Sequence, residues 1–220
     1  MKDIESKVNG LFQTPVYVTK FKNEFSKEEI FFINSEKEKT ILEKDLKLPG
    51  GNFGSGNRNV LDHLVFKDLK DKLNLILQDY MNKVVCPADD ILPYITQSWL
   101  TFTDPGKLHH EHTHPNSIVS GVFYFQVDEK MPPITFNRTT NSNFKREVFK
   151  YNEFNSENFL LPIKSGELIL FPSTLKHSVP INTSNKNRIS LSFNTFVSDK
   201  LGSEIELTEL NIKEILKQKD

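Results

Sequence analysis

Cysteine is almost absent from this sequence of 220 residues, because Cys86 is the only one. A single cysteine excludes a disulfide within the chain and any metal site built from several thiolates. An excess of one charge is also lacking, since 28 lysine and arginine residues stand against 29 aspartate and glutamate residues. Nucleic acids and anionic lipids attract basic surfaces, so this balance predicts neither as a partner.

Long apolar runs are missing as well. No stretch approaches the length of a bilayer-spanning helix, and the first residues, MKDIE, lack the apolar core of a signal peptide. We therefore expect a cytoplasmic protein without a membrane partner. A chain of this length can bury one sizeable core, which predicts a single domain over residues 1–220. Whether it forms a homodimer is left open.

Residues 1–90 read as helical and extended support for a core that follows. Leu11 to Phe21 is typical of an edge strand, because it is rich in β-branched and aromatic residues and contains a proline. Ser26, followed by two glutamates, predicts a helix that runs to about Lys39 and turns Ile30, Phe31 and Ile33 inward. Helical spacing of leucines predicts a second helix from Asp62 to Val85.

From about residue 91 to residue 200 the pattern changes to short strands separated by Pro, Gly and Asn, which indicates a sandwich or barrel. Residues 201–220 read as a short charged helix. The predicted fold class is therefore mainly β with helices (α+β). The expected strands are Tyr94–Thr103, Ser117–Val127, Ile134–Asn137, Leu160–Ile163, Glu167–Phe171, His177–Ile181 and Arg188–Val197.

Four of the six histidines lie within one segment, LHHEHTHPNS, at residues 108–117. On an extended strand, alternate side chains share a face, so His110, His112 and His114 would lie together, with His109 and Glu111 opposite. Neutral imidazoles that converge from one face are good ligands for iron, zinc, copper or nickel. This pattern favours a metal site over a solvated histidine-rich loop.

A second group of polar residues follows near the end of the strand-rich region. His177 comes six residues after the strand that ends at Phe171, and Arg188 opens a strand of strict alternation, RISLSFN. Its apolar residues share one face, whereas Arg188 and Ser190 lie on the other. Alternation alone would leave Arg188 in water.

The combination of HxHPNS, then SGVFYF, then GELILFPS with His177 and Arg188 resembles the 2-oxoglutarate- and Fe(II)-dependent oxygenases. More narrowly, it is similar to an oxygenase family of bacteria and phages, and the N-terminal LFQTPV is similar to the way members of that family begin. The resemblance implies a double-stranded β-helix, or jelly roll, as the core, buttressed by the N-terminal helices. It also implies Fe(II) as cofactor and 2-oxoglutarate as cosubstrate.

Carried onto this sequence, the resemblance implies that His112, His114 and His177 bind the metal and that Arg188 pairs with the distal carboxylate of 2-oxoglutarate. Tyr124 and Ser190 would support that carboxylate by hydrogen bonds. No residue of the chain is assigned as a catalytic acid or base. Residues such as Phe123 and Phe125, or their neighbours, would line the barrel and exclude water.

The sequence departs from the family at one ligand, because His114 stands where an Asp or Glu is expected. A second register, His109 and Glu111 with His177, would satisfy the His-x-acid pattern. We rank it second, because the PNS and SGV residues that follow tie the resemblance to His112 and His114. His110 would then orient a ligand or a bound molecule.

The implied activity is an oxygenase, expected to be a hydroxylase, that couples C–H oxidation to decarboxylation of 2-oxoglutarate to succinate. Two alternatives stay open at this point: a cupin-like metal enzyme that does not use 2-oxoglutarate, and a non-catalytic jelly-roll protein that binds metal. The substrate is not identified by any motif, and peptidyl, small-molecule and nucleobase substrates all stay open. The neutral charge balance counts against nucleic acid.

Overall fold

The computed structural model describes residues 5–21, 24–42, 47–87, 91–138 and 147–212. Its helical elements are α1 (Lys27–Leu42), the short turns η2 (Val60–Asp62) and η3 (Leu64–Phe66), α2 (Lys67–Tyr80) and the π-helical turn η4 (Met81–Val85). Its strands are β1 (Tyr17–Lys20), β2 (Phe53–Gly54), β3 (Leu92–Thr103), β4 (His109–His112), β5 (Val119–Gln126), β6 (Ile134–Asn137), β7 (Asn158–Leu161), β8 (Glu167–Pro172), β9 (His177–Val179), β10 (Arg188–Ser198), β11 (Lys200–Leu201) and β12 (Leu210–Asn211). Within these ranges, no helix combines the length and apolar character needed to cross a bilayer.

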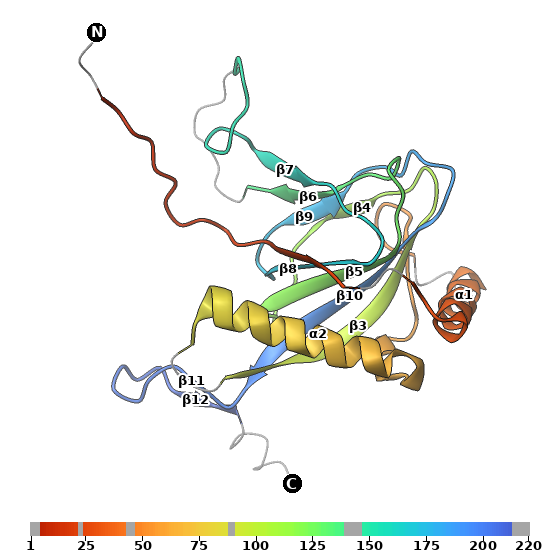
Figure 1. Ribbon diagram of the computed structural model, residues 1–220, viewed down its shortest axis with the longest axis horizontal. Coiled ribbons are helices and arrows are strands. Elements are labelled where there is room, and N and C mark those ends of the chain that lie inside the picture. The colour runs from red at the N-terminus through yellow and green to blue at the C-terminus, as the bar shows by residue number, and fades with distance from the viewer. Residues whose placement is uncertain (1–4, 22–23, 43–46, 88–90, 139–146, 213–220) are drawn as a thin grey trace.

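Two antiparallel sheets form the core of the molecule. The larger sheet has the strand order β1-β8-β5-β10-β3-β2, and the smaller has the order β4-β9-β6-β7. In Figure 1, α2 lies across one face of the larger sheet, and the smaller sheet lies on the side away from α2. This arrangement is a double-stranded β-helix covered by helices of the N-terminal half, as the sequence predicts.

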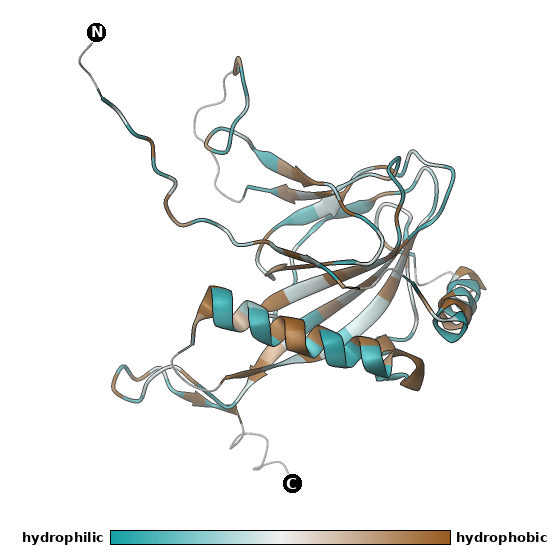
Figure 2. Cartoon of the chain, viewed as in Figure 1, coloured by the Kyte–Doolittle hydropathy of each residue, from teal (hydrophilic) through white to brown (hydrophobic). Residues whose placement is uncertain are grey.

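Strand β10 shows that the larger sheet has one apolar face, which packs on the helices, and one polar face, which the smaller sheet covers. Ile189, Leu191 and Phe193 pack into the cluster that also contains the buried leucines of α2. Buried residues recur along α2 at helical spacing and give the helix one apolar side for the sheet: Leu69, Leu73, Leu77 and Tyr80. Figure 2 shows the hydrophobic and hydrophilic bands along this helix. Arg188 and Ser190 are nevertheless only 2% exposed, because the smaller sheet covers the opposite face.

A second apolar cluster fills the space between the two sheets. It is formed by Val122, Tyr124, Ile134, Phe136, Ile163, Ile169 and Phe171. Phe123 and Phe125 belong instead to the helix-side cluster, so the prediction that they line the barrel is wrong and their neighbours do so. The reason is the alternation of β5, which sends odd-numbered phenylalanines toward the helices and Tyr124 toward the interior.

Helix α1 begins as predicted, with a reciprocal capping arrangement. The Glu29 backbone N–H donates to Ser26 Oγ at 3.0 Å, and the Ser26 N–H donates to the Glu29 carboxylate at 2.8 Å. Ile33 is buried, but Ile30 and Phe31 are 47% and 75% exposed, so their predicted inward orientation is wrong. The helix packs on the core along a narrower stripe than its apolar residues suggested.

Two predicted helices differ from the structure. The segment expected as one helix over residues 62–85 is divided into short turns, α2 and the π-helical turn. Leu64 is 86% exposed as a result, because the backbone N–H of Val65 donates to the His63 ring and begins a separate turn there. The predicted C-terminal helix is wrong for residues 201–211, where the chain turns back and β12 pairs with β11. Residues 213–220 lie outside the described part.

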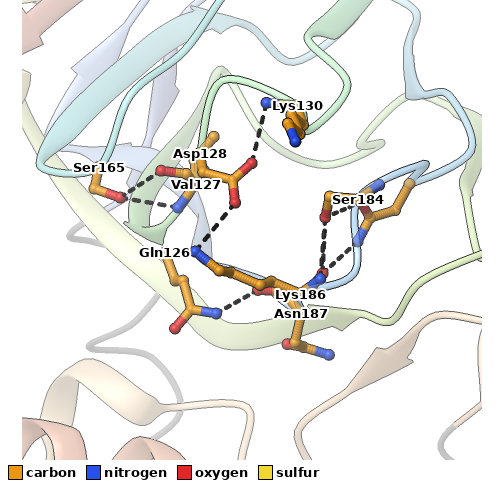
Figure 3. A network of polar contacts seen from close by, with 9 residues as sticks. Gln126, Val127, Asp128, Lys130, Ser165, Ser184, Lys186 and Asn187 are labelled. Carbon is orange, nitrogen blue, oxygen red and sulfur yellow. Dashed lines mark hydrogen bonds and ion pairs between the residues drawn. The ribbon is translucent and has the colours of Figure 1, made fainter.

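The seven strands predicted between residues 94 and 197 are confirmed, with shifts of up to two residues at their ends. The edge strand predicted over Leu11–Phe21 is shorter, because β1 covers only Tyr17–Lys20. Polar contacts tie the loop before β10 to the end of β5 (Figure 3). Gln126 Nε2 donates to the backbone oxygen of Asn187 at 2.6 Å, and the Lys186 ammonium lies 3.5 Å from the Asp128 carboxylate. These contacts hold the backbone immediately before Arg188, and so set where that side chain enters the barrel.

Candidate active site

His112 and His177 come from neighbouring strands of the smaller sheet. They are direct partners in the antiparallel pairing of β4 with β9, and their ring centroids are 4.4 Å apart. His114 follows β4, where its backbone N–H donates to the Ser173 oxygen at 2.9 Å. Each of the three imidazoles offers a ligand nitrogen, and these nitrogens lie within 4.8 Å of one another. The structure therefore brings together the three predicted metal ligands.

Backbone carbonyls orient two of these imidazoles. His112 Nδ1 lies 2.8 Å from the His110 oxygen, and His177 Nδ1 lies 2.9 Å from the Leu175 oxygen. A neutral ring that donates its Nδ1–H to a carbonyl has its free lone pair on Nε2. Such a contact fixes the tautomer and the orientation of a metal-binding histidine. Both rings are thus held with Nε2 available.

Burial keeps the histidines of this site neutral. Desolvation lowers the pKa of His177 to about 3 and that of His114 to about 4, and the neighbouring imidazoles add to both shifts. Burial also lowers the pKa of His112. Because a metal ion binds the deprotonated imidazole, little proton competition remains at neutral pH.

A bulge in β4 changes the predicted alternation of the histidine segment. The pairing of β4 with β9 shifts register between His109 and His112. As a result, the His109 ring stacks on that of His112 with centroids 4.6 Å apart, and His109, His110 and His112 form a second group of nearby ligand nitrogens. The expected placement of His109 on the opposite face is wrong, because a bulge rotates the residues on one side of it.

Glu111 points away from the histidines. Its carboxylate lies 3.2 Å from the Lys176 ammonium and accepts a hydrogen bond of 2.6 Å from Asn137 Nδ2. Among the described residues, it belongs to neither group of potential ligands. The geometry thus disfavours the second register, in which His109 and Glu111 would bind metal with His177.

Arg188 lies on the interior face of the larger sheet. Its guanidinium carbon is 5.1 Å from the centre of the Tyr124 ring, and Ser190 pairs with Tyr124 across the β10–β5 ladder. Burial is the main cause that lowers the pKa of Arg188, and it raises that of Tyr124 to about 12. No carboxylate among the described residues contributes to the shift of Arg188. A buried cation in this situation favours an anionic ligand.

Unpartnered polar atoms surround this guanidinium. Thr103 pairs with Arg188 and Thr101 pairs with Ser190 across the β10–β3 ladder, so these four side chains share the interior face. In the described part of the structure, the hydroxyls of Thr101 and Thr103 and the Nε of Arg188 are buried without a hydrogen-bond partner. The Tyr124 hydroxyl interacts with the Arg188 guanidinium, which raises the pKa of Arg188 against the larger lowering by burial. Buried polar atoms are seldom left unpaired, so this face is suited to a polar ligand such as a carboxylate.

Two threonines of this face were missed in the sequence, although a signal for them exists. In the segment QSWLTFT, residues Trp99, Thr101 and Thr103 alternate with apolar residues, just as Arg188 and Ser190 do in β10. Pairing the two polar faces would have found them. Trp99 continues the same face, and its ring centroid lies 5.9 Å from that of His114. The interior face thus runs from Arg188 toward the histidines.

Residues 97–194 match the family model described as "Putative 2OG-Fe(II) oxygenase". Over this segment the chain is similar to the 2OG-Fe(II) oxygenases. The matched segment contains all six predicted site residues: His112, His114, Tyr124, His177, Arg188 and Ser190. This family uses Fe(II) and 2-oxoglutarate, so the chain is an oxidoreductase. No curated protein matches it.

Solved structures of such oxygenases share the fold at low sequence identity. The 2-oxoglutarate-dependent carbocyclase SnoK from nogalamycin biosynthesis is 10% identical, with a TM-score of 0.55 and coverage of 84% of this chain and 81% of SnoK. HygX from Streptomyces hygroscopicus, solved with nickel and 2-oxoglutarate, is 13% identical, with a TM-score of 0.52 and coverage of 83% and 82%. A prolyl-4-hydroxylase from Pseudomonas putida is 12% identical, with a TM-score of 0.51 and coverage of 82% and 92%.

Proposed function

We propose that this oxygenase is a hydroxylase that binds Fe(II) through His112, His114 and His177. Supporting this ligand set, the three nitrogens converge and two of the rings are oriented through Nδ1. Three imidazoles with no protein carboxylate can hold Fe(II), but they leave its charge uncompensated. An anionic cosubstrate would then supply the missing negative charge.

The cosubstrate would lie between the histidines and Arg188. We assign Arg188 to the distal carboxylate of 2-oxoglutarate, because a planar guanidinium can bind both oxygens of a carboxylate. Tyr124 and Ser190 would donate hydrogen bonds to the same group. The single observation that carries this assignment is that Arg188 is 2% exposed and its Nε has no partner among the described residues.

When bound, Fe(II) and 2-oxoglutarate supply oxidation of a substrate C–H bond, coupled to decarboxylation of 2-oxoglutarate to succinate. The protein contributes ligands, orientation and a water-poor interior. Phe171 and Phe136 pack beside His177, with ring centroids 4.8 and 6.3 Å from its own. These rings cover one side of the site and limit access of water to it.

Anaerobic addition of Fe(II) and 2-oxoglutarate tests the proposal. We expect a weak visible charge-transfer absorption that appears only when both are present, and that is absent from the Arg188→Gln variant at the same cosubstrate concentration. Metal binding without any response to 2-oxoglutarate would contradict the proposal and favour a metal-binding protein without this cosubstrate. Succinate formation in air, measured over a panel of small molecules and peptides, would identify the substrate class.

We also propose that residues 1–220 form one domain, because α2 and its flanking turns share a continuous apolar cluster with the sheet that carries Arg188. A cytoplasmic location and the question of a homodimer stay predictions.

A further inference from the structure

Asn52 carries a buried side-chain amide that has no hydrogen-bond partner among the described residues. Its side chain lies in the glycine-rich segment PGGNFGSGN and is 0% exposed. Both ends of the amide, Nδ2 and Oδ1, lack a hydrogen-bond partner among the described residues. An asparagine can donate two hydrogen bonds and accept two, so a fully buried one that makes none is unusual. The space around this amide is therefore suited to a polar ligand that forms hydrogen bonds with it.

Extending the strand pairing by one residue beyond β2 places this amide on the interior face of the larger sheet. Phe53 pairs with Phe102 across β2 and β3 and packs on the helix-side cluster. Because successive residues of an extended chain point to opposite faces, Asn52 points to the interior. Continuing the β2–β3 register by one residue places Asn52 opposite Thr103, which is itself opposite Arg188.

The three side chains thus form a row across the sheet: Asn52, Thr103 and Arg188. Each has a buried polar atom without a partner in the part of the chain that is described. They come from segments separated by more than fifty residues, so local chain geometry cannot explain why all three lack a hydrogen-bond partner. A single polar ligand over this row would supply partners to all three.

The preceding glycines bring Asn52 to this position. Gly50 and Gly51 have φ angles of +97° and +83°, which favour glycine strongly. A Cβ on Gly50 would also lie 2.5 Å from Leu108 Cδ1 and 2.7 Å from the Leu108 oxygen. A backbone hydrogen bond holds the two segments together here, because the Leu108 N–H donates to the Gly50 oxygen at 3.2 Å. The tight turn therefore fixes the segment against the start of the histidine strand.

We propose that Asn52 is a positioning residue for the cosubstrate, with Nδ2 donating a hydrogen bond to the same carboxylate that Arg188 binds. A carboxylate cannot donate to Oδ1, so in the ligand-bound protein Oδ1 would accept from the Thr103 hydroxyl or from the Arg188 guanidinium and orient it. This inference rests on the proposed function, because it takes Arg188 as the carboxylate site. It extends the site to a segment outside residues 97–194, the part of the chain that matches the family model.

Affinity for 2-oxoglutarate tests this role. Zn(II) can replace iron as a redox-inactive metal for histidine ligands, and Trp99, the only tryptophan, reports binding by fluorescence because it lies beside His114. Asn52→Leu removes the amide at similar volume, and we expect its Kd for 2-oxoglutarate to rise about tenfold. Asn52→Asp adds a repelling charge and should weaken binding further. The Kd for Zn(II) alone should not change in either variant.

Asn57→Asp is the matched control, because it adds the same charge to an exposed residue of the same segment. It should bind 2-oxoglutarate as the wild type does. If Arg188→Gln weakens 2-oxoglutarate but both Asn52 variants bind normally, the role of Asn52 is overturned and the proposed function stands. If Arg188→Gln also binds normally, the proposed function itself fails.

A measurement on the wild-type protein covers the case in which the variants do not fold. The side-chain amide resonances of Asn52 should shift in ¹⁵N-resolved NMR spectra when 2-oxoglutarate is added to the Zn(II)-loaded chain. Glutarate, which has the same five-carbon chain and both carboxylates without the keto group, should cause a shift in the same direction. Resonances that do not move at saturating 2-oxoglutarate would overturn the proposal.

Discussion

His112 and His177 stand directly opposite each other in the pairing of β4 with β9, and their ring centroids are 4.4 Å apart. Sixty-five positions of chain separate them, yet the smaller sheet holds both rings on one face with Nδ1 bonded to a backbone oxygen. This pair defines where a metal ion can bind, and His114 adds the third nitrogen.

Removing one member of the pair should weaken metal binding. We expect His177→Ala to lower Ni(II) affinity about a hundredfold or more, since loss of a ligand costs at least as much as loss of its orienting contact. Isothermal titration measures the effect, and His63→Ala, outside both groups of ligands, is the control. Binding that survives in His177→Ala and disappears when His110→Ala is added would show that the second histidine group holds metal. Unchanged affinity in His177→Ala alone would exclude it as a ligand.

Arg188 should lower the stability of the ligand-free protein and raise its affinity for 2-oxoglutarate. Its buried guanidinium has no carboxylate partner among the described residues, and such a charge is costly in the absence of ligand. We expect Arg188→Met to raise the Tm of the ligand-free protein while it weakens 2-oxoglutarate about a hundredfold. Differential scanning calorimetry and the fluorescence titration measure the two effects. A lower Tm together with normal cosubstrate affinity would mean that Arg188 serves the fold alone.

Acid should destabilise the metal-free protein through its buried histidines. The folded-state pKa is about 3 for His177 and about 4 for His114, well below the ordinary value of 6.5. At pH values between 6.5 and the folded-state pKa, the unfolded chain binds more protons than the folded one. The contribution of each neutral, buried histidine to the free energy of unfolding is therefore complete above about pH 6.5, and it is lost as the pH falls to about 4 for His114 and about 3 for His177. Urea unfolding at a series of pH values measures this slope. His177→Gln should reduce it, and an unchanged slope would show that the His177 ring titrates normally.

Metal and cosubstrate should bind cooperatively. Three neutral imidazoles leave the charge of a divalent ion uncompensated, so 2-oxoglutarate should raise metal affinity, and the metal should raise 2-oxoglutarate affinity by the same factor. His114→Asp introduces a carboxylate at the position where the family usually has one. We expect this variant to bind Zn(II) more tightly without 2-oxoglutarate and to show a smaller coupling factor in paired titrations. Equal coupling in both proteins would argue against His114 as a ligand.

The sequence was informative where local pattern and tertiary packing agree. Alternation along RISLSFN correctly separated the two faces of β10, because one face needs an apolar partner and the other does not. Short runs of strand-forming residues between Pro, Gly and Asn located most strands, and Ser26 followed by two glutamates located the capped start of α1. The family resemblance, carried by the HxHPNS and FPS motifs, identified the oxygenase class and the double-stranded β-helix.

Other features depended on contacts between distant segments. A bulge turned His109 toward His112, which alternation could not reveal because a bulge breaks the periodicity from which the prediction was made. Ile30 and Phe31 are exposed because the position of α1 on the core, and not its composition, decides which side is covered.

By itself, the sequence determined which residue types are present and the periods at which they repeat, and these are sufficient for strands, caps and the grouping of histidines. Only the tertiary structure decided that Arg188 is buried beside hydroxyls that have no hydrogen-bond partner in the described segments, and that Asn52 lies in the same row. The physical reason is that burial and hydrogen-bond satisfaction depend on what packs from across the barrel, and no single segment carries that information.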